Sequence, residues 1–176
     1  MKSDVLKIAV PSTSEISNQL TGCYFVDSYK VTIENSVRSA LDTHHEIVSK
    51  TPDWINNLMA LRNKIVAIVG LKYLGHLGKV EPSKSANEYR VGDRVGIFSI
   101  LSLSAREVIL GDSDKHLNAK VSVYKFDEGE NKAVAISTVI HINNTLGKIY
   151  MLFVAPMHKL IAPAMLHLVA AGNNNA

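Results

Sequence analysis

Four polar side chains in the second half of the chain have the residue types needed for general acid–base chemistry: Glu107, His116, Asn118 and His141. If residues 111–114 form a turn, antiparallel pairing places Glu107 opposite Asn118. Side-chain alternation then puts both on one face with His116. A carboxylate beside an imidazole tunes the imidazole pKa toward neutrality, which suits an enzyme of the cyclase or isomerase kind. The sequence therefore nominates Glu107, His116 and His141 as candidate acid–base groups.

A second interpretation makes the same cluster a solvated outer surface, and we expect this one first. One register of the two strands at 116–126 and 132–142 forms a wholly apolar face from Leu117, Ala119, Val121 and Val123 with Val134, Ile136, Ile140 and Ile142. The opposite face then carries His116, Asn118 and His141 toward water. A slip of one residue would turn the whole cluster inward.

Other reactive patterns are absent or weak. The chain has no CxxC, HExxH, GxGxxG or phosphate-binding loop, so we expect neither a metal nor a cofactor. His158 and His167 are nine positions apart, on opposite sides of a helix, and cannot share one metal ion. His44 lies on an apolar helical stripe and is expected to be a core histidine. The single cysteine, Cys23, excludes an intramolecular disulfide, which suits a reducing cytoplasmic compartment.

The composition is that of a soluble globular domain and names no charged partner. The chain has 176 residues, 47% of them hydrophobic, and a formal net charge of +3. Basic residues are scattered and aromatic residues make up 6%, so we expect no nucleic-acid binding. Residues 149–172 are apolar, but they include Lys159 and two prolines, so we expect a buried helix and no transmembrane span. Lys148 and Lys159 share one helical face, which leaves peripheral membrane contact open.

The elements that must position these residues follow a simple order: strand, two helices, a β-meander and a closing helix. β-Branched and aromatic residues favour strands at 23–33, 95–103, 105–110, 116–126 and 132–142. Asn35 or Ser36 is expected to cap the first helix, and Thr51-Pro52-Asp53 to begin the second. The closing helix spans about 146–171 and is expected to kink at Pro156 or Pro163.

This order predicts an α+β fold, because strands and helices are segregated along the chain, and it resembles the helix-grip arrangement. In it a curved antiparallel β-sheet wraps its apolar face around the long C-terminal helix, with two short helices after the first strand. We expect a partly irregular N-terminal segment at 1–20, one domain at 21–172 and a frayed tail at 173–176. Residues 75–93 form a long polar connection, which is either a binding loop or slack.

Several stretches from residue 22 onward carry a family resemblance: Pro52-Asp-Trp54, Leu61-Arg-Asn-Lys64, Glu107-Val-Ile-Leu-Gly111, the run 114–123, Asn143-Asn-Thr-Leu-Gly-Lys-Ile-Tyr150 and the run 156–166. In these stretches the chain resembles a bacterial family known as domain of unknown function 2867. The resemblance implies the helix-grip fold of START-like and Bet v 1-like (SRPBCC) proteins, which hold ligands between sheet and helix. It implies no particular activity.

The leading functional expectation is a small hydrophobic or amphipathic ligand bound in a cavity between sheet and helix. Ligand sites usually measure about 300–1,000 Å³. The residues expected to contact the ligand are Trp54, Leu58, Asn118, Ile136, Ile140, Tyr150 and Phe153. Two alternatives stay open: the acid–base enzyme described above, and a homodimeric interaction module built on the closing helix or a sheet edge. The sequence names neither the ligand nor a reaction.

Overall fold

The structure, a computed structural model, describes residues 4–33, 38–68 and 85–173. At 65–68 and 171–173 the description covers the backbone alone. Most of the polar connection predicted at 75–93 lies outside the described residues.

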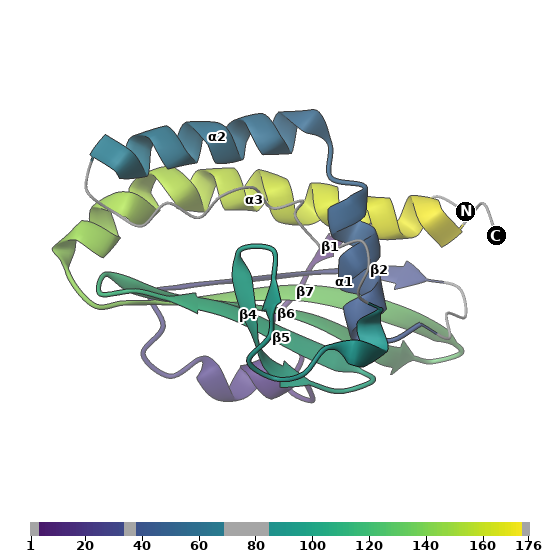
Figure 1. Cartoon of the computed structure of the whole chain (residues 1–176). Coiled ribbons are helices and arrows are strands. Elements are labelled where there is room, and N and C mark those ends of the chain that lie inside the picture. Colours follow the sequence, from purple (N-terminus) through teal and green to yellow (C-terminus); the bar gives the residue numbers. More distant parts are fainter. Residues whose placement is uncertain (1–3, 34–37, 69–84, 174–176) are drawn as a thin grey trace.

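The described residues form an antiparallel sheet of seven strands in the order β1-β2-β7-β6-β5-β4-β3 (Figure 1). The strands are β1 (Leu6–Lys7), β2 (Phe25–Ile33), β3 (Arg94–Val95), β4 (Phe98–Leu103), β5 (Glu107–Ser113), β6 (Leu117–Glu128) and β7 (Asn131–Ile142). Three α-helices lie on one face of this sheet: α1 (Ala40–Ser49), α2 (Asp53–Ile68) and α3 (Thr145–Asn173). The predicted α+β architecture is confirmed.

Two short 3-10 helices complete the described elements: η1 (Glu15–Gln19) and η2 (Ala86–Glu88). Figure 1 shows η1 on the face of the sheet opposite the three α-helices. We call the face that meets α3 the inner face and the face that meets η1 the outer face.

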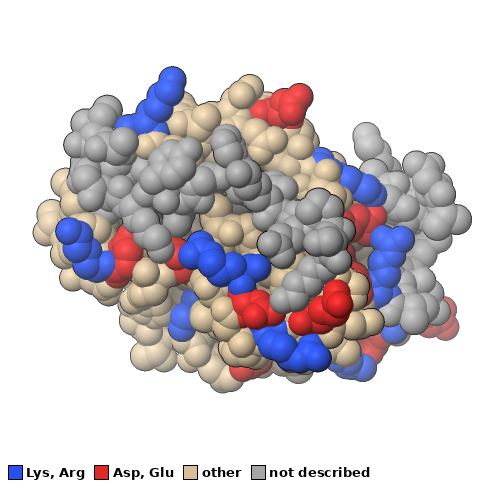
Figure 2. Space-filling view, in the orientation of Figure 1, with Lys and Arg blue, Asp and Glu red and all other residues tan. Residues whose placement is uncertain are grey.

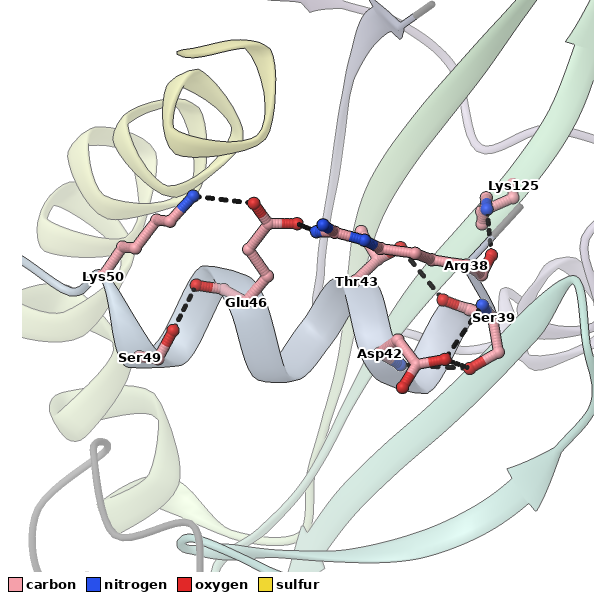
Figure 3. A network of polar contacts seen from close by, with 8 residues as sticks. All are labelled: Arg38, Ser39, Asp42, Thr43, Glu46, Ser49, Lys50 and Lys125. Atoms are coloured by element: carbon pink, nitrogen blue, oxygen red, sulfur yellow. Dashed lines mark hydrogen bonds and ion pairs between the residues drawn. The ribbon is translucent and has the colours of Figure 1, made fainter. Parts of the chain in front are cut away.

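Helix α1 begins after Ser39, and not after Asn35 or Ser36 as predicted. The Ser39 hydroxyl accepts the Asp42 amide at 3.1 Å, and the Asp42 carboxylate accepts the Ser39 amide at 3.1 Å. Ser39 and Asp42 thereby form a reciprocal capping box, in which each side chain accepts the backbone amide of the other residue. Glu46, near the end of the helix, pairs with Arg38 and Lys50, so charged contacts line its exposed side (Figure 3).

The register of β6 against β7 places the residues of the predicted apolar face on one side of the sheet, but the polar Thr138 lies among them, opposite Val121. Leu117 pairs with Ile142, Ala119 with Ile140, and Val123 with Ile136. Together with apolar residues of β2 and β5, this inner face packs against α1 and α3 in the main core of the protein. Fully buried members of that core are Val31, Leu41, Leu110, Val123, Val134 and Leu166.

The register of β5 against β6 differs from the predicted one. Residues 111–113 continue the strand, and the tight connection lies at Lys115 and His116. The physical reason is Asp114, whose carboxylate accepts the amides of His116 and Leu117 and so stabilises the turn there. Glu107 consequently pairs with Tyr124, and not with Asn118.

The outer face is only partly solvated, because the N-terminal segment covers much of it. Ile16 of η1 is fully buried and packs against Ile109 and Val139, with Val10, Leu20 and Cys23 around them. The segment predicted to be partly irregular therefore contains β1 and η1, and it builds a second, smaller core.

Candidate ligand cavity and its polar wall

A cavity of about 200 Å³ lies between the inner face of the sheet and helices α1, α2 and α3. Its apolar wall consists of Ile47, Val48, Met59, Ile97, Phe98, Leu117, Ala119, Val121, Val123, Ile136, Ile140, Val154, Met157, Ile161, Ala162 and Met165. A few polar side chains interrupt this wall: His44, Arg62, Asp112, Asp114, Thr138, Tyr150 and His158.

Helix α3 presents one stripe of residues to the cavity. Tyr150, Val154, Met157, Ile161 and Met165 recur at intervals of three or four, so they lie on one side of the helix. Outside this stripe the helix carries exposed apolar residues, among them Leu152 at 69% and Leu160 at 64% of their full exposure. By length and hydropathy alone α3 could cross a membrane, and 28% of its most apolar window is buried inside the protein. Peripheral membrane contact and dimer formation stay predictions.

The seven residues predicted to contact a ligand divide into two groups. Ile136, Ile140 and Tyr150 line the cavity. The other four, Trp54, Leu58, Asn118 and Phe153, are not among its described lining residues. Trp54 and Phe153 are 43% and 52% exposed, and Asn118 pairs with His141 on the outer face.

Three side chains from distant parts of the sequence form a hydrogen-bonded chain in the cavity wall. Asp27 of β2 and Thr138 of β7 are direct partners across the two strands, so their side chains stand together on the inner face. His158 of α3, which packs over the inner face, contacts both side chains. Its Nδ1 lies 3.1 Å from Asp27 Oδ2, and its Nε2 lies 3.2 Å from Thr138 Oγ1. The Phe25 and His158 rings pack in a T-shaped arrangement with their centroids 6.0 Å apart.

The direction of the hydrogen bonds in this chain follows from the carboxylate. An ionised carboxylate only accepts, so Nδ1 of His158 must carry the proton and donate it to Asp27. In a neutral imidazole Nε2 is then the acceptor, and the Thr138 hydroxyl donates to it. Asp27 is 4% exposed, and its second oxygen, Oδ1, has no hydrogen-bond partner among the described residues.

A second polar pair stands at the end of the cavity that faces α2. Arg62 is only 7% exposed. Its Nε donates to the Tyr150 hydroxyl at 2.9 Å, and its Nη1 donates to Asn63 Oδ1 at 2.9 Å. Burial raises the pKa of the Tyr150 phenol, and the nearby Arg62 charge opposes that shift. Tyr150 therefore keeps its proton at neutral pH and can donate it to a ligand.

The predicted acid–base cluster is not assembled. Glu107 and His141 stand on the same outer face, but Glu107 pairs with Tyr124 whereas His141 pairs with Asn118. Six residues of β6 separate these two positions, a span of about 20 Å at 3.3 Å per residue. Glu107 is also occupied, because it accepts from Ser14, Ser122 and the first amides of η1.

The two histidines of that prediction lie apart from Glu107. His116 is buried in the turn before β6, where its Nδ1 contacts the Asn144 side chain at 3.1 Å. His141 contacts the Thr21 carbonyl through Nε2 at 3.1 Å, beside an open groove on the outer face. The described residues contain no group of three His, Cys, Asp or Glu side chains close enough to share a metal ion.

Sequence reasoning missed Asp27 and Thr138 and weighed His158 only as a metal ligand. A signal for the first two was present. Asp27 stands at an inner position of an otherwise apolar alternation, between Phe25 and Tyr29. Thr138 interrupts the inner series of β7 in the same way, between Ile136 and Ile140. Polar residues at inward positions of two adjacent strands are a reason to look for a shared partner.

Charge is mixed over the visible face of the protein. In Figure 2 acidic and basic side chains lie beside one another along its lower part, and no extended field of one sign appears on the side shown. The described residues on this side therefore offer no electrostatic footprint for a polyanion.

The fold and cavity define an α+β protein in which an antiparallel sheet and a C-terminal helix enclose a small apolar site. Residues 19–165 match the family described as "Protein of unknown function (DUF2867)", and the chain belongs to this family. No curated protein matches the chain. Among solved structures, the chain is similar to the crystal structure of CalU16 from Micromonospora echinospora. The sequence identity is 9% and the TM-score 0.29, with 97% of this chain and 91% of that chain covered.

Proposed function

We propose that this protein binds a small, mainly apolar molecule in the cavity between the sheet and α3. The observation that carries the proposal is the cavity itself, about 200 Å³ in volume and walled mostly by aliphatic side chains. A ligand that fills this space would bury its apolar surface against these side chains, which is favourable.

The volume and the polar wall restrict the ligand. An apolar cavity of about 150 Å³ accepts benzene, so this one suits a single ring or a short alkyl chain with a small substituent. The Thr138 hydroxyl oxygen can accept a hydrogen bond, and the Tyr150 hydroxyl can donate one, along a mainly apolar wall. The ligand class that fits is therefore a compact amphipathic molecule with one or two oxygen-bearing groups.

Two measurements test the proposal. Native mass spectrometry of the protein purified from its own cells is expected to retain a small molecule. Titration of emptied protein with dimethylaminobenzonitrile, a neutral single-ring dye whose emission depends on polarity, is expected to change the dye fluorescence and to raise the melting temperature. At a dye concentration of 100 Kd the stabilisation should be about 2.7 kcal/mol.

A cavity-filling variant locates the site. Val121 lines the cavity opposite Thr138, so Val121→Phe should occupy the space and weaken dye binding at least about tenfold. The matched control is Val26→Phe, which adds similar bulk on the exposed outer side of β2 and should bind like the wild type. Equal weakening by both variants, or no binding by the emptied wild type, would contradict the proposal.

A further inference from the structure

We infer that Asp27, His158 and Thr138 form a nucleophilic catalytic site that hydrolyses small carboxylic esters held in the cavity. The inference rests on the proposed function, because the apolar acyl group of the ester would occupy the same cavity. Thr138 is the nucleophile, His158 the general base, and Asp27 the residue that positions the imidazole.

The geometry meets the conditions for an activated hydroxyl nucleophile. Such a site needs a hydroxyl within hydrogen-bond reach of a base, and a third group that orients the base. Thr138 Oγ1 lies 3.2 Å from His158 Nε2, and Asp27 Oδ2 lies 3.1 Å from His158 Nδ1. Both Thr138 and His158 line the cavity, so a bound acyl group would lie beside the hydroxyl.

A purely structural role explains the chain poorly. A buried carboxylate is costly to desolvate, and apolar residues in the place of buried ionised groups are often neutral or stabilising. Here apolar residues flank Asp27 and Thr138 at the inward positions of both strands. Moreover, Asp27 Oδ1 is buried without a partner among the described residues, an arrangement that lowers stability. We therefore assign the buried Asp27 carboxylate a functional role.

The reaction balances with water as the only co-reactant. Thr138 Oγ1 attacks the ester carbonyl carbon while its proton passes to His158 Nε2, and a new C–O bond forms. The bond between that carbon and the leaving oxygen breaks, and Nε2–H protonates the departing alcohol. Water then attacks the acyl-threonine and gives a proton to Nε2. The acid leaves, and Thr138 regains its proton from Nε2.

Hydrolysis of nitrophenyl butyrate by the purified full-length chain tests the inference. The wild type is expected to release nitrophenol, and brief exposure should leave a butyryl group on Thr138, detected by peptide mass mapping. Thr138→Val and His158→Gln should each lower kcat/KM at least about 100-fold. Thr138→Ser keeps a hydroxyl and should restore much of the rate. His141→Gln is the control for background hydrolysis by an outer-face imidazole and should match the wild type.

The kcat and KM of an Asp27 variant distinguish a residue that orients the imidazole from one that only shapes the site. Asp27→Asn removes the charge that orients the imidazole, so kcat should fall at least about tenfold while KM for nitrophenyl butyrate stays within about twofold. A change confined to KM would assign Asp27 to the shape of the site instead.

The outcomes separate this inference from the proposed function. Dye binding that persists in Thr138→Val while turnover disappears supports both. Dye binding without hydrolysis by the wild type, or hydrolysis that survives in Thr138→Val and His158→Gln, overturns the inference and leaves the cavity as a binding site. Absence of dye binding by the wild type contradicts the proposed function and, with it, the binding site that the inference requires.

Discussion

Two buried carboxylates stand on opposite faces of the same sheet, and they have opposite surroundings. Glu107, on the outer face, accepts from the hydroxyls of Ser14 and Ser122 at 2.6 Å each, from the Glu15 amide at 2.7 Å and from the Ile16 amide at 3.4 Å. Asp27, on the inner face, has one described partner, His158, and leaves Oδ1 unpaired within the described residues.

The difference separates a structural carboxylate from a candidate functional one. Glu107 satisfies the free amides at the start of η1 and anchors the N-terminal segment to the sheet, so its acceptor capacity is used. Asp27 uses part of its capacity to orient an imidazole that borders a cavity. Residue type favours Glu107 as an acid–base group, whereas the surroundings favour Asp27 and His158.

The largest effect should follow removal of the outer-face carboxylate. Glu107→Ala leaves two hydroxyls and two amides without their acceptor, so we expect a loss of roughly 3–5 kcal/mol in the free energy of unfolding. Urea denaturation measures it. The control is Asp127→Ala, which removes a half-exposed carboxylate paired with Arg106 and should change stability by less than about 1 kcal/mol. Similar losses of stability in both variants would contradict the structural role that we assign to Glu107.

An intermediate effect is expected from His44, a partly buried histidine in the cavity wall. Burial, reinforced by the neighbouring His45, lowers the pKa of His44 to about 3 in the folded protein. The unfolded chain protonates this group below about 6.5 and the folded protein does not, so stability is present above that pH and is lost as the pH falls. Between pH 7 and pH 5 the loss attributable to His44 should be about 2 kcal/mol.

Urea denaturation at the two pH values, on the wild type and on His44→Leu, measures this effect. The variant should lose most of the pH dependence. Some should remain, because burial also lowers the pKa of His45. An unchanged pH dependence in His44→Leu would contradict the assignment and show that other groups titrate.

The smallest effect on stability should come from the inner-face carboxylate. Asp27→Asn keeps the size of the side chain and an oxygen that can accept from His158, while it removes a buried charge. We expect the free energy of unfolding to change by less than about 1 kcal/mol, or to rise. Calorimetric melting of Asp27→Asn beside Glu107→Ala is the direct comparison. A loss in Asp27→Asn as large as that in Glu107→Ala would make both carboxylates structural.

Strand patterns predicted much of the fold because they are local. Alternation in β6 and β7 was enough to put Leu117 and Ala119 on one face with Ile140 and Ile142. The same patterns, with the apolar closing helix, placed Ile136, Ile140 and Tyr150 at the cavity. The predicted β5–β6 register was wrong for a different local reason. The Asp114 carboxylate accepts two amides of the turn and so moves the turn by a few residues.

The sequence by itself determined the α+β class, the apolar inner face and the presence of a helix for that face to grip, because periodicities of two and 3.6 residues depend on near neighbours. Only the tertiary structure decided which polar residues meet. Asp27 and His158 are 131 residues apart, and no local pattern encodes their contact. It exists because β2 pairs with β7 and α3 crosses above both strands. The same packing buries Glu107 beneath η1 and places Thr138 in the cavity wall.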